Sequence, residues 1–113
     1  MQAIDPKPVT TDPAAVPVRI LGKTGEVVPV LGLGTAPAGM GLEDSAAVEL
    51  FHAAVDRGVT YLDTAPVYQR AQKQLGQMLP ERRGDVFVVT KVLTAKAAEA
   101  LEILLQSLKD LRI

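Results

Sequence analysis

Apolar residues along the 113-residue chain alternate between short β-favouring runs and longer stretches with helical spacing. Two runs, at 18–21 and 26–30, flank a glycine-containing turn and predict a hairpin. Pro29 cannot donate to a ladder and therefore places the second run at an edge. Three further runs, at 31–34, 59–62 and 85–90, predict strands. The last is apolar and β-branched, and we expect it to be buried on both faces.

Three amphipathic helices are predicted, at 44–57, at 70–79 and from Thr94 onward. Asp44 or Ser45 supplies the N-cap of the first helix, and Gly58 ends it. Pro80 is expected to end the second helix. After the hairpin, strands and helices alternate, which indicates parallel strands joined by crossover helices in an α/β fold.

Four prolines stand in the first 17 residues, which contain few large apolar side chains. Proline fixes φ and removes a backbone donor, so this composition predicts a flexible N-terminal extension over 1–17. The α/β domain is expected over 18–113.

Composition excludes several classes of function. Twelve Lys and Arg against thirteen Asp and Glu give a net charge of −1, so no basic excess favours nucleic acid or anionic lipid. Cysteine is absent and His52 is the single histidine, which argues against a metal site. We read His52 as a solvated residue on the polar face of the first helix. No signal peptide or membrane-spanning run is visible, and we expect a soluble, cytoplasmic protein.

A glycine-rich segment follows the first predicted parallel strand. Gly32-Leu-Gly34-Thr-Ala-Pro37 begins like the dinucleotide fingerprint G-x-G-x-x-G, but Pro37 stands where the third glycine is required. Gly39 and Gly41 extend the loop, so no helix is expected to begin at once. We interpret the segment as a glycine-rich turn, and keep a small nucleotide-binding α/β domain as an alternative.

Asp63 and Tyr68 follow the second parallel strand, and Lys91 follows the third. Parallel strands end at the same sheet edge, so the three side chains could meet there. A lysine cation beside a phenol stabilises the phenolate, and a carboxylate holds that lysine charged, which would make Tyr68 a usable general acid. Taken singly, each residue also suits a capping, solvated or half-buried role.

Several ordered motifs together resemble the aldo-keto reductases. The first signature of that family is similar to Gly58-Val-Thr-Tyr-Leu-Asp63-Thr-Ala-Pro-Val-Tyr68 followed, after six residues, by Leu75-Gly76. Flanking segments match in order and spacing: Arg19-Ile-Leu-Gly-Lys-Thr-Gly25, Leu31-Gly-Leu-Gly34-Thr35 and Asp85-Val-Phe-Val-Val-Thr90-Lys91. The resemblance covers the chain from about Val18 onward.

This resemblance implies the N-terminal part of a (β/α)8 TIM barrel, with the hairpin at its bottom and about three βα units. It implies an NADPH-dependent reductase of aldehyde or ketone carbonyls, with a small-molecule substrate. By motif position, Tyr68 is the general acid, Lys91 the neighbouring cation and Asp63 its carboxylate partner. The cofactor-binding residues implied are Gly34, Thr35, Ala36 and Asp63.

The sequence departs from the family in three respects. Gln69 replaces the usual glycine after the tyrosine, and Gln72 stands where a glutamate is favoured. The family's catalytic histidine belongs to a fourth strand, whereas this sequence finishes with the third helix. We therefore expect a truncated barrel, inactive alone and prone to self-association through open sheet edges. A non-catalytic half-barrel with an interaction role is the remaining alternative.

Overall fold

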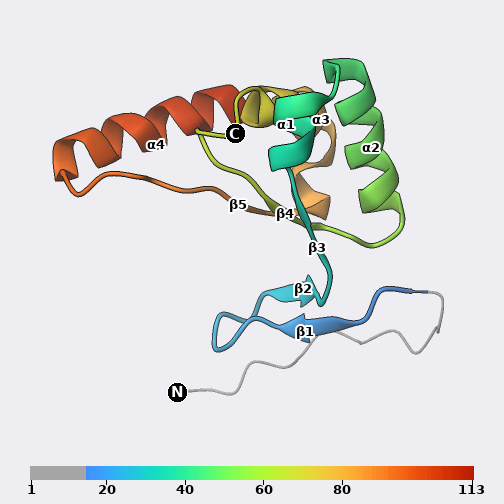
Figure 1. Cartoon of the computed structure of the whole chain (residues 1–113). Helices are drawn as coiled ribbons and strands as arrows, with labels where there is room; N and C mark the ends of the chain where they lie inside the picture. Colours follow the sequence, from blue (N-terminus) through green and yellow to red (C-terminus); the bar gives the residue numbers. More distant parts are fainter. Residues whose placement is uncertain (1–14) are drawn as a thin grey trace.

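A computed structural model describes residues 15–113, with a hairpin, a parallel sheet and four α-helices (Figure 1). The strands are β1 (Val18–Ile20), β2 (Val27–Pro29), β3 (Gly32–Gly34), β4 (Tyr61–Asp63) and β5 (Phe87–Val89). The helices are α1 (Ala36–Gly41), α2 (Asp44–Asp56), α3 (Ala71–Arg82), the 3-10 turn η1 (Arg83–Asp85) and α4 (Ala97–Leu111). The extension predicted for 1–17 lies, except for 15–17, outside the described residues.

The sheet has the order β3-β4-β5, and both pairings are parallel. Leu33, Leu62 and Val88 are aligned across the three strands. These middle residues pack into the core, because side chains of a strand alternate between the two faces of a sheet. The neighbouring positions project to the opposite face, where the aligned rings of Tyr61 and Phe87 stack with centroids 5.2 Å apart.

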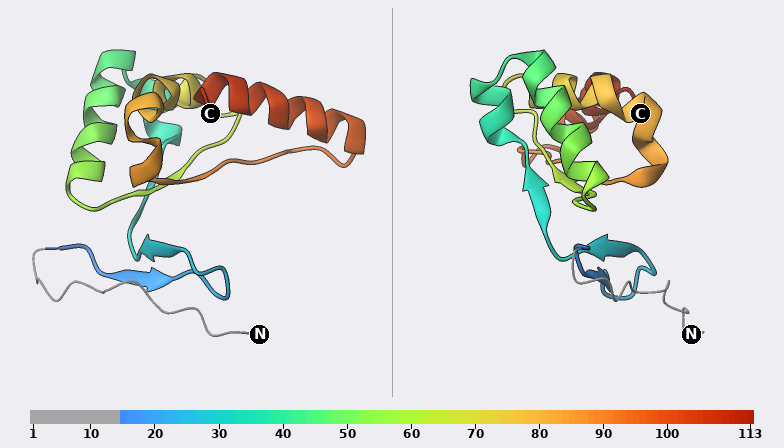
Figure 2. Two further views of the ribbon diagram at one scale, coloured as in Figure 1. Left: turned by 180° about the vertical axis from the view of Figure 1, so that it is seen from behind. Right: turned by 90° about the vertical axis from the view of Figure 1, so that its right-hand side faces the viewer.

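The core lies between the sheet and the helices, which gather on one side of it (Figures 1 and 2). The buried cluster consists of Ala38, Ala47, Phe51, Val55, Leu62, Leu75, Met78, Leu79 and Leu111. Three of its members, Ala47, Phe51 and Val55, lie on one face of α2, as its helical spacing predicts. The parallel βα units expected for a barrel segment are therefore confirmed.

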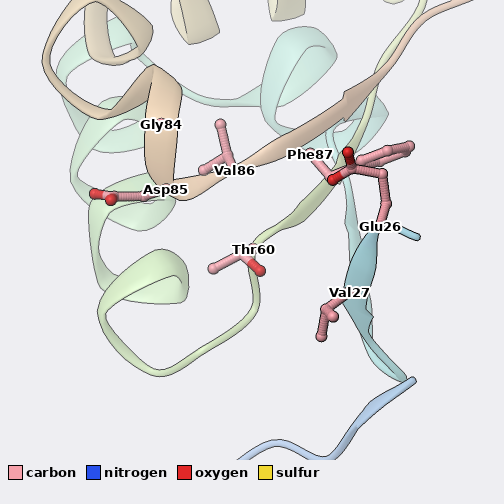
Figure 3. A pocket seen from close by; sticks show the side chains of 7 residues that line it. All are labelled: Glu26, Val27, Thr60, Gly84, Asp85, Val86 and Phe87. Carbon is pink, nitrogen blue, oxygen red and sulfur yellow. The ribbon is translucent and has the colours of Figure 1, made fainter. Parts of the chain in front are cut away.

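The hairpin is confirmed as an antiparallel pair, with Arg19 opposite Val28. It lies beyond the amino ends of the parallel strands (Figures 1 and 2). An open cavity of about 170 Å³ separates it from the ends of β4 and β5. The cavity is lined by Glu26, Val27, Thr60, Gly84, Asp85, Val86 and Phe87 (Figure 3). Because these residues surround the amino ends of the strands, the cavity lies at the opposite end from Asp63.

Two expectations are wrong: the extended loop at Gly39 and Gly41, and the end of the second helix at Pro80. Helix α1 begins at Ala36, directly after β3, because Pro37 occupies the first helical turn, where proline is favoured. Helix α3 continues through Pro80 to Arg82. Arg82 stabilises this last turn through Asp56 at 2.6 Å and Asp85 at 3.3 Å.

The start of α2 also differs from the prediction. Neither Asp44 nor Ser45 caps it; Glu43 is the N-cap residue, without a side-chain hydrogen bond. The Asp44 carboxylate instead forms an ion pair with Arg70 at 3.0 Å and accepts a hydrogen bond from Gln74 at 3.1 Å. The predicted end is confirmed, because Gly58 adopts a φ of 89°, which favours glycine.

Strand β5 is less buried, and His52 more buried, than the sequence predicts. All three β5 residues are half-buried, because the helices cover only one face of the sheet. His52 is half-buried rather than fully solvated, and its Nδ1 lies 3.5 Å from the Arg82 guanidinium. In the described part of the chain, no helix is long and apolar enough to cross a membrane.

Candidate active site

The carboxyl ends of β4 and β5 bring together the three residues that the sequence singled out. Asp63 is the last residue of β4, and Lys91 stands two residues after β5. The backbone of Thr64 continues the pairing by donating to the Val89 carbonyl at 2.8 Å. Tyr68 returns from the loop between β4 and α3.

The Lys91 ammonium group holds this arrangement together. Its Nζ donates to Asp63 Oδ2 at 2.7 Å, to the Thr64 carbonyl at 2.9 Å and to Tyr68 Oη at 3.2 Å. An ammonium has three protons, so these three acceptors match its full capacity. Nζ also lies 4.9 Å from the centroid of the Tyr68 ring, within the range of a cation–π interaction.

These contacts determine the charge of the lysine and the direction of the phenol proton. The hydrogen bond to Asp63 is the main cause of a raised Lys91 pKa, with Tyr68 adding to it and desolvation opposing it. The lysine therefore stays protonated at neutral pH and has no lone pair to accept from Tyr68. The Tyr68 hydroxyl accepts from Lys91 and must direct its own proton elsewhere. Tyr68 is half-buried rather than fully enclosed.

The loop that carries Tyr68 packs closely against α1. The Tyr68 amide donates to the Ala65 carbonyl at 3.1 Å, and the Tyr68 carbonyl accepts from the Ala71 amide at 3.0 Å. Gly39 approaches the same carbonyl so closely that an added Cβ would overlap Tyr68 O and lie 2.6 Å from Ala71 Cβ. Gln69 has a φ of 52°, a left-handed conformation that is unusual for a residue with a side chain. The glycine that usually follows this tyrosine in the aldo-keto reductases would adopt the same conformation without strain.

The predicted cofactor residues lie beside Asp63, at the end of β3. The Thr35 amide and hydroxyl both donate to the Asp63 carbonyl at 2.9 Å, and Thr35 is fully buried. Its side chain therefore fixes Asp63 rather than facing outward. Gly34 is exposed, and open space surrounds the place where a Cβ would stand. Ala36 is half-buried at the start of α1.

Sequence reasoning missed the groups that support this cluster. The Thr64 carbonyl accepts from Lys91 through the backbone, and no pattern of side chains in the sequence predicts such a contact. The glycine-rich composition predicts a loop at Gly39, whereas Gly39 forms a close contact between α1 and the Tyr68 loop. His52 lies on α2 beside Arg82 and takes no part in the cluster.

The aldo/keto reductase family model matches residues 30–113. Two similar curated proteins are pyridoxal 4-dehydrogenase of Microbacterium luteolum and D-threo-aldose 1-dehydrogenase of a Pseudomonas species. The first is 42% identical over 79 residues, which are 66% of this chain and 23% of that protein. The second is 37% identical over 86 residues, which are 72% of this chain and 24% of that protein. The chain therefore spans about a quarter of the length of these relatives.

Solved structures show the same likeness. A protein described as an aldo-keto reductase from Pseudomonas aeruginosa superposes with a TM-score of 0.78 at 36% identity, covering 84% of this chain and 41% of that one. The holo form of an aldo-keto reductase from Bacillus halodurans superposes with a TM-score of 0.72 at 28% identity, covering 84% and 36%.

Proposed function

Because the chain belongs to the aldo/keto reductase family and forms part of its (β/α)8 barrel, we propose that it supplies the proton-donating half of a carbonyl-reducing site. The proposed substrates are small aldehydes or ketones, and the proposed reductant is NADPH. Two relatives are named as dehydrogenases of an aldose and of pyridoxal, which is consistent with chemistry between carbonyl and alcohol.

A single observation carries the proposal: Lys91 Nζ is shared between Asp63 at 2.7 Å and Tyr68 Oη at 3.2 Å. Asp63 keeps the lysine charged and oriented. The ammonium then stabilises the phenolate that remains once Tyr68 gives its proton to the carbonyl oxygen. A donor held in place before the reaction requires no reorganisation when charge develops on the substrate oxygen.

The residues at the end of β3 fit the ribose and nicotinamide end of a dinucleotide. Open space beside Gly34 admits a flat ring, and the half-exposed Asp63 carboxylate can accept hydrogen bonds from ribose hydroxyls. Ala36 adds a small side chain at the start of α1, and Thr35 fixes Asp63 from behind. When bound, a reduced nicotinamide supplies the hydride for the carbonyl carbon. We propose Gly34, Thr35, Ala36 and Asp63 as the contribution of this chain to cofactor binding.

We further propose a small-molecule substrate, with neither nucleic acid nor membrane as a partner, and a cytoplasmic location. The net charge of −1 supports the assignment of partners, because the chain has no basic excess for nucleic acid or anionic lipid.

A barrel chimera tests the proposal. Residues 15–113 replace the matching part of the Pseudomonas aeruginosa relative, and carbonyl reduction is followed by the loss of reduced-nicotinamide absorbance. We expect activity in the chimera and none in the 113-residue chain alone. Lys91→Met should remove the activity, whereas Lys96→Met, at an exposed lysine five residues later, should preserve it. Equal activity of the two variants would contradict the proposal, and a folded but inactive chimera would favour a non-catalytic half-barrel.

A further inference from the structure

The buried side chain of Gln72 links three elements around Lys91. Its Oε1 accepts a hydrogen bond from Thr90 Oγ1 at 2.6 Å, and its Nε2 donates to Ser107 Oγ at 3.2 Å. Gln72 belongs to α3, Thr90 directly follows β5 and Ser107 belongs to α4. Gln72 is 4% exposed and Ser107 is 1% exposed, so water does not compete strongly for either contact.

The contact with Thr90 acts at a place where the backbone has little other support. Strand β5 ends at Val89, and α4 begins only at Ala97. The hydrogen bond from Thr90 to Gln72, called here the Thr90 tie, therefore holds the segment 90–96 to the helical layer, one residue before Lys91. Lys91 in turn must reach acceptors on two other segments, Asp63 Oδ2 and Tyr68 Oη.

We propose that Gln72 is a positioning residue that acts through Thr90 to fix the end of β5, and with it the location of Lys91 Nζ between Asp63 and Tyr68. An amide suits this position because its two ends differ: the oxygen accepts from Thr90, and the nitrogen donates to Ser107. Ser107 thereby fixes the orientation of the amide. The importance of this contact for catalysis rests on the function proposed above, whereas its effect on Lys91 can be measured without cofactor or substrate.

The test is reductive methylation of lysines in the intact chain, resolved residue by residue by mass spectrometry, with the exposed Lys73 as internal reference. The reagent modifies only unprotonated amines, and the Asp63 hydrogen bond raises the pKa of Lys91. Thr90→Val removes the tie with little change in shape. It should raise the Lys91-to-Lys73 labelling ratio by about threefold, the equivalent of half a pKa unit. Thr90→Ser keeps the hydroxyl and should leave the ratio unchanged.

Substitutions of the glutamine separate positioning from packing. Gln72→Met should raise the ratio as Thr90→Val does. Gln72→Glu keeps an acceptor for Thr90, and because a nearby carboxylate favours the protonated lysine it should give the wild-type ratio or a lower one. Gln74 is the matched control: it is a fully buried glutamine of the same helix, and it donates to Ala38, Leu42 and Asp44 instead. Gln74→Met should lower stability without raising the ratio.

The proposal is overturned if Thr90→Val and Gln72→Met give the same ratio as Gln74→Met, or if Gln72→Glu behaves like Gln72→Met. Should Gln72→Met fail to fold, the Thr90 pair decides the question, because Thr90 is only half-buried. A labelling response together with an inactive chimera would refute the proposed function alone. An active chimera without a labelling response would refute the positioning role alone.

Discussion

Gly39 and Gly41 lie two residues apart on α1, and the same substitution should have opposite effects at them. Alanine favours a helix over glycine by about 1 kcal/mol, so each change gains up to that amount. At Gly39 the new Cβ would overlap the Tyr68 carbonyl oxygen and lie 2.6 Å from Ala71 Cβ. Overpacking of this kind costs about 1–3 kcal/mol, and a backbone oxygen cannot rotate away. With the full helical gain subtracted from this cost, the net result for Gly39→Ala is a loss of up to about 2 kcal/mol.

Nothing lies within 4 Å of the corresponding position at Gly41, so Gly41→Ala should be neutral or stabilising by up to about 1 kcal/mol. Urea denaturation followed by far-UV circular dichroism measures both variants, and the shift of the midpoint at constant slope gives the change in the free energy of unfolding. Gly39→Ala should also disturb the Tyr68 loop and raise the labelling of Lys91. If both variants shift the midpoint in the same direction, the close contact between α1 and the Tyr68 loop is refuted.

Three further predictions concern the same chain. Because Asp63 raises the pKa of Lys91, their hydrogen bond stabilises the fold at neutral pH and loses this effect as the pH rises through the folded-state pKa of the lysine. Asp63→Asn should thus lower the free energy of unfolding by about 1 kcal/mol at neutral pH. When urea unfolding is measured at strongly alkaline pH instead, the variant and the parent chain should be equally stable. Gln69→Gly should stabilise the chain by about 0.5–1 kcal/mol in the same assay by relieving the positive φ, whereas Gln69→Ala should give no gain. In the described sheet, β3 and β5 each pair on one side only, so sedimentation of the 113-residue chain should show concentration-dependent self-association; a monomer at every concentration would contradict this.

The strands, the hairpin and the long helices could be predicted because their causes are local. Short runs of apolar and β-branched residues define β4 and β5, and helical spacing defines α2. Helix α1 was missed because its glycines indicate a loop by composition, while the close packing that requires Gly39 is a tertiary contact. Pro80 does not end α3, because Arg82 stabilises the last turn through ion pairs with Asp56 of α2 and Asp85 of η1.

The candidate site was predictable to a similar extent. Asp63 ends β4 and Lys91 follows β5, and the parallel pairing of these strands places both residues at one edge of the sheet. The tie through Gln72 could not be derived, because its partners lie 18 and 35 residues away and no local pattern distinguishes a buried glutamine from an exposed one. The sequence alone indicated only that glutamine replaces a glutamate there.

We propose that Tyr68, held by Lys91, donates the proton in carbonyl reduction. The chain contains two tyrosines, so Tyr61→Phe is a matched control for Tyr68→Phe. Tyr61 stacks on Phe87 near the amino ends of the strands, away from Lys91. In the barrel chimera, Tyr68→Phe should lower kcat by about a hundredfold or more, as expected for the loss of a general acid, while Tyr61→Phe stays within a few-fold of the parent. Comparable turnover in the two variants would contradict the account.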